Sequence, residues 1–416
     1  MSRALARVAA LPSLHDALAL RLVVAASASR WAIGSLRVRL PGGEERIFGT
    51  PGATPVGTIE VHDPSFFGRL LLRGEVGFGE AFTEGLWSSP DLVGLLRACA
   101  INRRALAADR GWWRLPARLL DRRWHLGRRN TVSRSRENIT AHYDLGNDFY
   151  RLFLDPTMTY SGAVFGSEDP SLEEAQVEKY RRIARLAGIE RGSHVLEIGT
   201  GWGGFAVHAA EELGCRVTTI TISEAQRELA LARVRDRGLS ARIEVQLCDY
   251  REVEGQYDAV VSIEMLEAVG SEYYGSFFAT CDRALRPGGR IGLQVITVPD
   301  RAYETQRRGV NWVQRYIFPG GLLPSRAAIE RALAGTDLSI TSADDIGQDY
   351  ARTLRAWRER FLARRDEVRA LGLGDRFQRM WEYYLALCEA GFATGVTQNL
   401  QIGLAKPAMA AERMVG

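Results

Sequence analysis

A glycine-rich turn is the first place in this sequence where residue types and spacing point to chemistry. An apolar run that begins at His194 reads His-Val-Leu-Glu-Ile and passes into Gly-Thr-Gly-Trp-Gly-Gly at residues 199–204. Glycine serves where a chain turns tightly or approaches a ligand closely. A dinucleotide-binding turn reads G-x-G-x-x-G and is followed by an acid about 20 residues later. Here Glu197 precedes the turn, so the pattern differs from that fingerprint.

Four motifs in order resemble class I S-adenosyl-L-methionine (SAM) methyltransferases. The E-x-G-x-G-x-G run at residues 197–203 is similar to their first motif, and Asp249-Tyr250 follows a third apolar run. Residues 258–263 form a fourth run, and Leu-Arg-Pro-Gly-Gly at 285–289 precedes a fifth. A lone glycine turn can be purely structural, but the four motifs together are specific. The resemblance implies SAM as methyl donor, with no metal.

Two further segments carry a narrower resemblance. Residues 138–147 read Asn-Ile-Thr-Ala-His-Tyr-Asp-Leu-Gly-Asn, and residues 153–161 read Phe-Leu-Asp-Pro-Thr-Met-Thr-Tyr-Ser. Other matches lie at residues 265–270, 316–325 and 349–361. Together these segments resemble the cyclopropane fatty acid synthase and mycolic acid methyltransferase family over about residues 60 to 405.

The resemblance implies which residues hold SAM. Tyr160 and Ser161 would hold its methionine end, and Thr221 and Gln226 would bind the ribose. Taken singly, Tyr160 could be a core aromatic, Thr221 a strand residue and Gln226 a surface amide. The remaining expected contacts are Asp249 and Tyr250 around the adenine, with Glu197, Gly199, Gly201, Ile222 and Ile263.

Family chemistry begins when the cis double bond of an acyl chain takes the methyl group of SAM, which leaves a carbocation in the chain. The resemblance implies an apolar tunnel, negative or π-electron density near the cation, and a bicarbonate base held by a Cys, a Glu, a His and a Tyr. Glu267 and Tyr350 stand at matching positions, but Gly162 and Gln294 replace the Cys and the His. The base therefore remains open between a carboxylate and a bound anion. His142 is a further catalytic candidate.

Glu264 is the carboxylate that could act directly. It precedes Glu267 by three residues, and this E-x-x-E spacing predicts two acids on one helix face. Glu264 could instead be a surface acid or a cofactor contact.

The same carbocation can give two different products. Proton loss from the added methyl closes a cyclopropane, whereas a hydride shift before that loss leaves an exocyclic methylene. Gln294 and the run at residues 264–270 most resemble the actinobacterial branch that makes the methylene precursor of tuberculostearic acid. We therefore predict SAM-dependent C-methylation of an oleoyl-type phospholipid chain, giving a 10-methylene chain that a separate flavin-dependent reductase would saturate.

Three alternatives stay open. The first is a cyclopropane-fatty-acyl-phospholipid synthase, and the second is a degenerate lipid-binding protein that kept the fold. A small-molecule or nucleic-acid methyltransferase would explain the fold, but not the segments at residues 138–147 and 316–325.

Positioning these residues requires a set of strands. Short apolar runs alternate with helix-like segments at Val195–Gly199, Arg216–Thr221, Ile243–Leu247, Tyr257–Ile263 and Arg290–Ile296. The alternation predicts an α/β fold, namely a Rossmann-like, doubly wound sheet that binds ligands at the carboxyl ends of its strands. After Pro299 the chain is helix-rich, and a helical lid is expected at about residues 300–405.

Two regions precede the catalytic domain expected at residues 137–416. Residues 1–102 mix helical and strand patterns, which predicts a smaller α+β domain that docks on lipid. Residues 103–136 interleave eleven arginines with three tryptophans and form a linker. This composition suits an anionic membrane phospholipid surface. Nucleic acid is the rival partner, which we do not predict, and a solvated linker is the third interpretation.

Composition excludes disordered and membrane-spanning classes. The 416 residues are 46% hydrophobic and 25% charged, with a net charge of +4. Arg21 and Arg30 interrupt the most apolar run, so no membrane span is predicted. Five scattered cysteines favour a reducing compartment and no zinc cluster. We expect a cytoplasmic protein peripheral to the inner face of the membrane, and a homodimer is left open.

Overall fold

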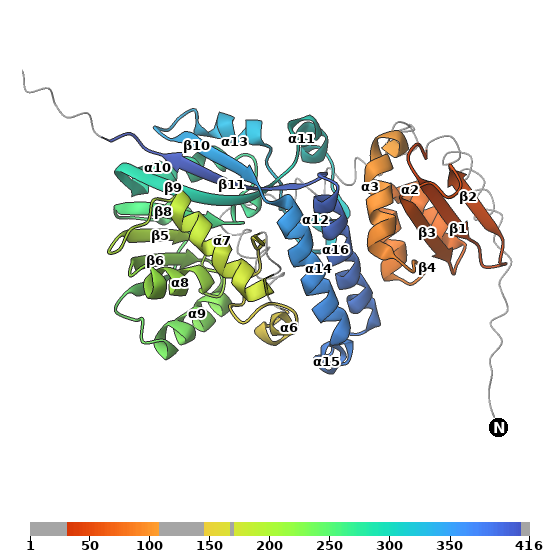
Figure 1. The fold of residues 1–416 in the computed structure, drawn as a ribbon, viewed down its shortest axis with the longest axis horizontal. Helices are drawn as coiled ribbons and strands as arrows, with labels where there is room; N and C mark the ends of the chain where they lie inside the picture. The colour runs from red at the N-terminus through yellow and green to blue at the C-terminus, as the bar shows by residue number, and fades with distance from the viewer. Residues whose placement is uncertain (1–30, 108–144, 167–169, 409–416) are drawn as a thin grey trace, which may run out of the picture. The chain divides into compact units, whose positions relative to one another are not determined.

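The computed structural model describes residues 31–107, 145–166 and 170–408. These residues fall into two compact units (Figure 1). One contains residues 31–107 and Leu362–Thr394, and the other contains residues 145–361 and 395–408. Most of the arginine–tryptophan stretch, and His142, lie outside the described residues.

The larger unit is built on a seven-stranded mixed sheet in the order β10-β11-β9-β8-β5-β6-β7. The strands are β5 (His194–Ile198), β6 (Arg216–Thr221), β7 (Ile243–Leu247), β8 (Tyr257–Ile263), β9 (Leu285–Thr297), β10 (Ser339–Asp345) and β11 (Gln398–Ala405). Strands β5 to β9 pair in parallel, whereas β11 runs antiparallel to both β9 and β10. The predicted Rossmann-like α/β fold is confirmed.

Alternating side chains of the central strands feed two hydrophobic cores, one on each face of the sheet. On one face Val195 and Val217 pack with α7, α8 and α9. On the other, Leu196 packs with Phe277 and Ile329 of α10 and α13. Figure 1 shows the helices flanking the sheet, and their bounds are α7 (Leu172–Leu186), α8 (Gly204–Glu212), α9 (Glu224–Asp236), α10 (Tyr274–Ala284) and α13 (Arg326–Leu333).

The chain after Pro299 supplies both helices and the two antiparallel strands. The further elements of the larger unit are α6 (Asn147–Arg151), η2 (Tyr250–Glu252), η3 (Leu266–Ala268), α11 (Asp300–Arg307), α12 (Trp312–Tyr316) and α14 (Gly347–Ala363), whose last two residues belong to the smaller unit. Strands β10 and β11 are not expected from the apolar pattern, because β11 carries Asn399 and Gln401 at fully buried positions.

The smaller unit combines a four-stranded sheet with helices, which confirms the α+β expectation. Its elements are β1 (Ser35–Arg39), β2 (Glu45–Gly49), β3 (Val56–Val61), β4 (Trp87–Ser88), α2 (Ser65–Thr83), α3 (Leu92–Ala107), α15 (Arg365–Ala370) and α16 (Asp375–Ala393). Helix α16 packs against α2 and α3. Phe82 lies between Trp87 and Tyr383, with ring centroids 5.0 Å and 5.5 Å away. Aromatic packing thus joins elements distant in sequence.

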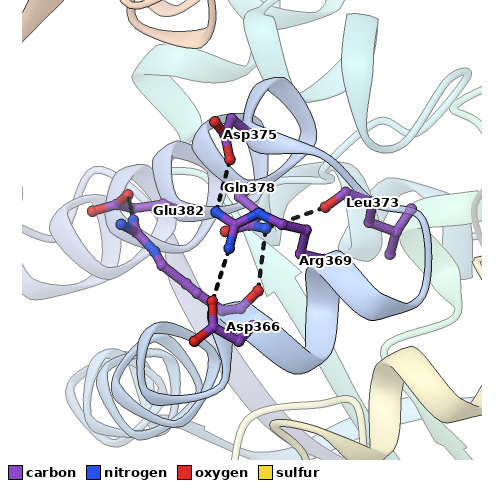
Figure 2. Close-up of polar contacts among 7 residues, drawn as sticks. Asp366, Arg369, Leu373, Asp375, Gln378 and Glu382 are labelled. Atoms are coloured by element: carbon purple, nitrogen blue, oxygen red, sulfur yellow. Dashed lines mark hydrogen bonds and ion pairs between the residues drawn. The ribbon is translucent and has the colours of Figure 1, made fainter. Parts of the chain in front are cut away.

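Polar contacts fix the turn between α15 and α16. Figure 2 shows Arg369 between Asp366 and Asp375, at 2.8 Å and 3.0 Å. The Gln378 amide donates to the backbone oxygens of Arg365 and Leu373, each at 3.2 Å. The ion pairs are exposed and therefore contribute little each, whereas the amide bonds hold the backbone of the turn.

Within the described parts of the chain, no helix combines the length and the apolar character needed to cross a membrane.

Replacing Gly292 by alanine should test the contact between α7 and β9. A Cβ at Gly292 would lie 2.5 Å from the Ile183 backbone oxygen, and backbone cannot move aside cheaply. We expect Gly292→Ala to lower the free energy of unfolding by about 3 kcal/mol. In the control Gly275→Ala, on α10, the new Cβ meets nothing within 4 Å. Equal thermal stability of the two variants would contradict this packing.

Candidate functional site

Apart from Tyr160 and Ser161, the predicted cofactor residues lie at or near the carboxyl ends of β5, β6, β7 and β8. After β5, Gly199 and Gly201 have φ values of 104° and 52°, which side chains with a Cβ rarely adopt. A Cβ at Gly201 would meet nothing within 4 Å, and one at Gly199 would touch only Met265. The turn therefore leaves room for a ligand against its backbone.

The ends of β6 and β7 hold the polar residues expected around the nucleoside. The Thr221 hydroxyl donates to Gln226 Oε1 at 2.9 Å, and Ile222 follows Thr221 in the turn. Asp249 accepts two bonds from the Arg251 guanidinium, at 2.8 Å and 2.6 Å, while Tyr250 is buried beside it. The Arg251 backbone amide donates a third bond to Asp249 Oδ1 at 3.0 Å, so Arg251 fixes the position of this carboxylate. Their contacts with SAM stay predictions.

Glu197 is a buried acid on β5. Its Oε2 accepts a hydrogen bond from the Thr219 hydroxyl at 2.6 Å. Burial raises the pKa of Glu197 to about 8, because the charged form loses its hydration. The hydrogen bond from Thr219 and the charge of Lys179 oppose that rise. Glu197 therefore keeps its proton to a higher pH than an exposed carboxyl group does.

Ser161 is held by two side chains of α7 that the sequence patterns did not reveal. The Lys179 ammonium donates to Ser161 Oγ at 2.7 Å, and the Gln176 amide donates to the Ser161 carbonyl oxygen at 2.9 Å. Both α7 side chains are fully buried. Their i, i+3 spacing puts them on one helix face. Because the sequence has only two lysines, a lysine at this spacing from Gln176 is the signal that could have identified the pair.

Four donors converge on the carboxylate of Glu264. Its Oε1 accepts from the Gly162 backbone amide at 2.9 Å, from Gln294 Nε2 at 2.8 Å and from Asn399 Nδ2 at 2.7 Å. The Tyr350 hydroxyl donates to Oε2 at 2.9 Å. The structure thus brings together three predicted catalytic residues and adds Asn399 from the last strand. Charge-assisted bonds of this kind fix a carboxylate in one position.

The prediction that Glu264 and Glu267 share one helix face is wrong. Glu264 follows β8 with φ of 51°, in the left-handed region, and Glu267 lies in the single-turn helix η3. A residue other than glycine at such a φ costs of order 1–3 kcal/mol and is found chiefly where the surroundings require it. Here the four hydrogen bonds to the Glu264 carboxylate offset that cost.

These residues do not fit a bound bicarbonate. The amide of Gly162, the amide of Gln294 and the hydroxyl of Tyr350 all point at Glu264. A free anion would have to compete with that carboxylate for the same donors and would lie beside its negative charge. Glu264 therefore occupies the position in which the family resemblance places an anion.

Glu267 is the second carboxyl group of the site. Its Oε1 accepts a bond from the Ile296 backbone amide, while its Oε2 is buried with no hydrogen-bond partner among the described residues. Burial raises the pKa of Glu267 to about 8, and the charge of Glu264 adds to the rise. A buried acceptor without a donor is costly, which is typical of a position that a reacting group uses.

Tyr350, whose hydroxyl bonds Glu264, belongs to a group of packed aromatic rings. The Tyr160 and Trp357 ring centroids are 5.2 Å apart, and Tyr350 meets Trp357 edge-on at 6.1 Å. Tyr150 also contacts Tyr160, at 5.3 Å. Faces of such rings attract cations. The site therefore combines carboxylates with π-electron density, and Trp357 is a further residue whose position could not be inferred from spacing.

The described site residues come from separate parts of the chain. Ile263 ends β8 directly before Glu264, and Tyr160 and Ser161 lie in the segment between α6 and α7. His142 lies outside the described residues, so its predicted role is left as a prediction.

The chain is similar to several known proteins. A profile of the mycolic acid cyclopropane synthetase family matches residues 130–402. The tuberculostearic acid methyltransferase UfaA1 of Mycobacterium tuberculosis is 44% identical over 348 residues, which cover 81% of each chain. The cyclopropane-fatty-acyl-phospholipid synthase of Escherichia coli K12 is 36% identical and covers 84% of this chain and 88% of its own.

Among solved structures, mycolic acid cyclopropane synthase CmaA1 complexed with SAH and CTAB is 31% identical, with a TM-score of 0.62. The match covers 65% of this chain and 98% of that one.

The protonation of Glu267 should be visible in protein stability. Its pKa rises from 4.5 to about 8 on folding, so the folded protein binds this proton more tightly and loses stability as pH increases across that interval. A glutamine side chain at this position does not titrate. We therefore expect the melting temperature of Glu267→Gln relative to wild type to increase over the same interval, by on the order of 5 °C.

The matched control is Glu228→Gln, which changes an exposed acid on α9. Scanning calorimetry across the interval measures both differences. A Glu267→Gln difference that stays flat with pH, like that of the control, would show that Glu267 is not a proton-holding group.

Proposed function

We propose a specific reaction for this chain, which belongs to the mycolic acid cyclopropane synthetase family and is a SAM-dependent methyltransferase of lipids. In this proposal it converts the cis double bond of an oleoyl-type phospholipid chain into a 10-methylene branch. SAM is the methyl donor, and we expect it to bind against the open glycine turn at residues 199–201. The observation that carries the proposal is the Glu264 carboxylate, which is held by four donors. The same site contains Glu267, whose Oε2 has no hydrogen-bond partner among the described residues and whose pKa the charge of Glu264 helps to raise.

This arrangement suits a short-lived carbocation. The double bond supplies the electron pair of the new carbon–carbon bond, and its other carbon becomes positive. A fixed carboxylate at Glu264 and the rings of Tyr160 and Trp357 provide stabilisation that needs no reorganisation during the reaction. The strain at Glu264 is consistent with a charge kept in place for this purpose.

We assign the proton acceptor to Glu267. Its Oε2 has no hydrogen-bond donor among the described residues. In its ionised form Glu267, with a pKa of about 8, is a stronger base than an exposed carboxylate, so it accepts the proton from the deprotonated state. After a hydride moves from the methylated carbon to the cationic carbon, the proton leaves the new methyl group for Oε2. The electron pair of that carbon–hydrogen bond becomes the exocyclic double bond, so charge and atoms balance.

Gln294 favours the hydride shift over ring closure. Both routes remove a proton from the added methyl group. The product therefore depends on whether that proton is removed before or after the hydride shift. An imidazole at this position could accept or relay it at once, whereas the Gln294 amide cannot. The 44% identical relative is named for tuberculostearic acid, which supports the methylene product. A cyclopropane synthase is the second candidate, favoured by the 36% identical relative.

The proposal includes a location and partners. A phospholipid substrate requires access to a membrane surface, so we propose a cytoplasmic protein at the inner face of the membrane, with anionic phospholipid as its docking partner. A separate flavin-dependent reductase would act on the methylene product. In the same proposal, residues 1–102 dock on lipid, and the protein can form a homodimer.

Product analysis tests the reaction. Oleoyl phospholipid vesicles are incubated with the protein and methyl-labelled SAM, and the released fatty acids are derivatised at the double bond and examined by mass spectrometry. We expect a labelled 10-methylene chain. Glu267→Gln should lower turnover at least about 100-fold while SAH binding by calorimetry stays within about threefold.

Each alternative has its own result in this experiment. A labelled cyclopropane would replace the methylene proposal with the second candidate. Cofactor binding without any labelled lipid would indicate a degenerate lipid-binding protein. An active Glu267→Gln enzyme would remove the assignment of Glu267 as proton acceptor.

Removing dissolved carbon dioxide and bicarbonate should leave the wild-type rate unchanged, because Glu264 already holds the donors of the anion position. Glu264→Gly is compatible with a φ of 51° and frees those donors. We expect this variant to lose about 100-fold in rate and to recover partly with added bicarbonate or formate.

Glu264→Gln is the matched control, since its amide fills the same space and should give no recovery. SAH formation measured in degassed and bicarbonate-supplemented buffer gives the comparison. A wild-type enzyme that slows when bicarbonate is removed would show that an external anion does bind.

A further inference from the structure

Lys179 is a buried cation to which neither the sequence patterns nor the proposed reaction gives a role. All but two of the 54 basic side chains are arginine, the exceptions being Lys179 and Lys406. Lys179 lies on α7 and is fully buried. Its ammonium forms no ion pair with a carboxylate of the described residues, and its closest polar contact is Ser161 Oγ at 2.7 Å. Burying such a charge is expensive unless something compensates for it.

The contact determines what Ser161 can bind. A serine hydroxyl has one hydrogen to donate and an oxygen that accepts. Because the ammonium of Lys179 can only donate, the hydroxyl oxygen accepts from it, and the hydroxyl hydrogen is left for another acceptor. Gln176 fixes the Ser161 carbonyl oxygen at 2.9 Å, so backbone and side chain are both anchored to α7.

We propose that Lys179 is a positioning residue that makes Ser161 a donor to the carboxylate of the methionine part of SAM, an inference that rests on the proposed contact between Ser161 and that part of the cofactor. The ammonium also supplies positive charge behind the hydroxyl. A carboxylate ligand would thus receive a hydrogen bond strengthened by a nearby cation.

The surroundings of Lys179 agree with this role. Its ammonium lies 4.7 Å from the centroid of the Tyr180 ring, a contact that stabilises a cation. Burial lowers the pKa of Lys179 to about 7, while Glu264, Asp155 and Glu197 oppose the shift from a greater distance. A bound carboxylate would favour the protonated form further.

A purely structural lysine would anchor the Ser161 segment whatever the ligand. The two roles separate when the ligand lacks its carboxylate. We therefore compare SAH with decarboxylated SAH, which keeps the amine, the thioether and the nucleoside. Calorimetry gives the dissociation constant of each ligand for the full-length wild type, Lys179→Met, Lys179→Arg and Ser161→Ala.

Lys179→Met should weaken SAH binding by about 10- to 100-fold and change binding of the decarboxylated ligand by less than about threefold. In Ser161→Ala the further loss caused by Lys179→Met should be much smaller, because the two residues act through one contact. Lys406→Met is the matched control, since Lys406 bonds Asp282 O and lies outside the site. It should leave both constants unchanged.

Equal losses for both ligands, or no loss for either, would overturn the role of Lys179. If Lys179→Met fails to fold, Lys179→Arg keeps the charge but changes the shape of the donor, so any loss of affinity should be confined to SAH. Equal losses for both ligands in that variant also count against the inference. If Ser161→Ala does not affect SAH, the proposed contact of Ser161 fails, independently of Lys179.

Discussion

Burying a carboxylate at the end of a parallel strand costs free energy, which hydrogen-bond donors must offset. This constraint accounts for the polar residues that surround Glu264 and Glu267 in the larger unit. Among the described residues, Glu264 receives four donors, whereas Glu267 receives the Ile296 amide at Oε1 and has no partner at Oε2. The two acids are thereby made different. One is fixed in position by four hydrogen bonds, and the other has its pKa raised to about 8. Neighbouring acids with separate environments can take separate roles.

The donors come from distant parts of the sequence because of the sheet topology. Strand β11, the last of the chain, inserts beside β9 and pairs Gln401 with Gln294. The Gln401 amide donates to Gln294 Oε1 at 2.9 Å, which directs the Gln294 amide toward Glu264. Asn399, two residues earlier, reaches Glu264 itself. A strand that only closed the sheet would not need fully buried amides at these positions.

Sequence patterns predicted the parts of this arrangement that repeat in regular ways. Apolar runs located β5 to β9, and the glycine turn located the cofactor end of the sheet. They did not predict β11, because its alternating polar residues face a buried site and so resemble an exposed strand. They also misplaced Glu264 on a helix, since spacing alone cannot show that a residue has positive φ. Lys179 was missed for a related reason: the partner that makes it informative, Ser161, is 18 residues away.

The differences from the bicarbonate pattern depend on one another. Gly162 lies so close to its neighbours that a Cβ there would be 2.7 Å from Asn399 Nδ2 and 2.8 Å from the Tyr350 ring. Asn399 and Tyr350 are two of the donors to Glu264, so their approach and a side chain at position 162 exclude each other. Gln294 supplies a third donor and also bonds the Gly162 carbonyl oxygen at 2.9 Å. A cysteine at position 162 or an imidazole at position 294 would disturb the same network. The hydrogen bonds to the Glu264 carboxylate thus fit Gly162 and Gln294, and a larger side chain at position 162 or a different donor at position 294 would have to displace Asn399, Tyr350 or Gln294 from it.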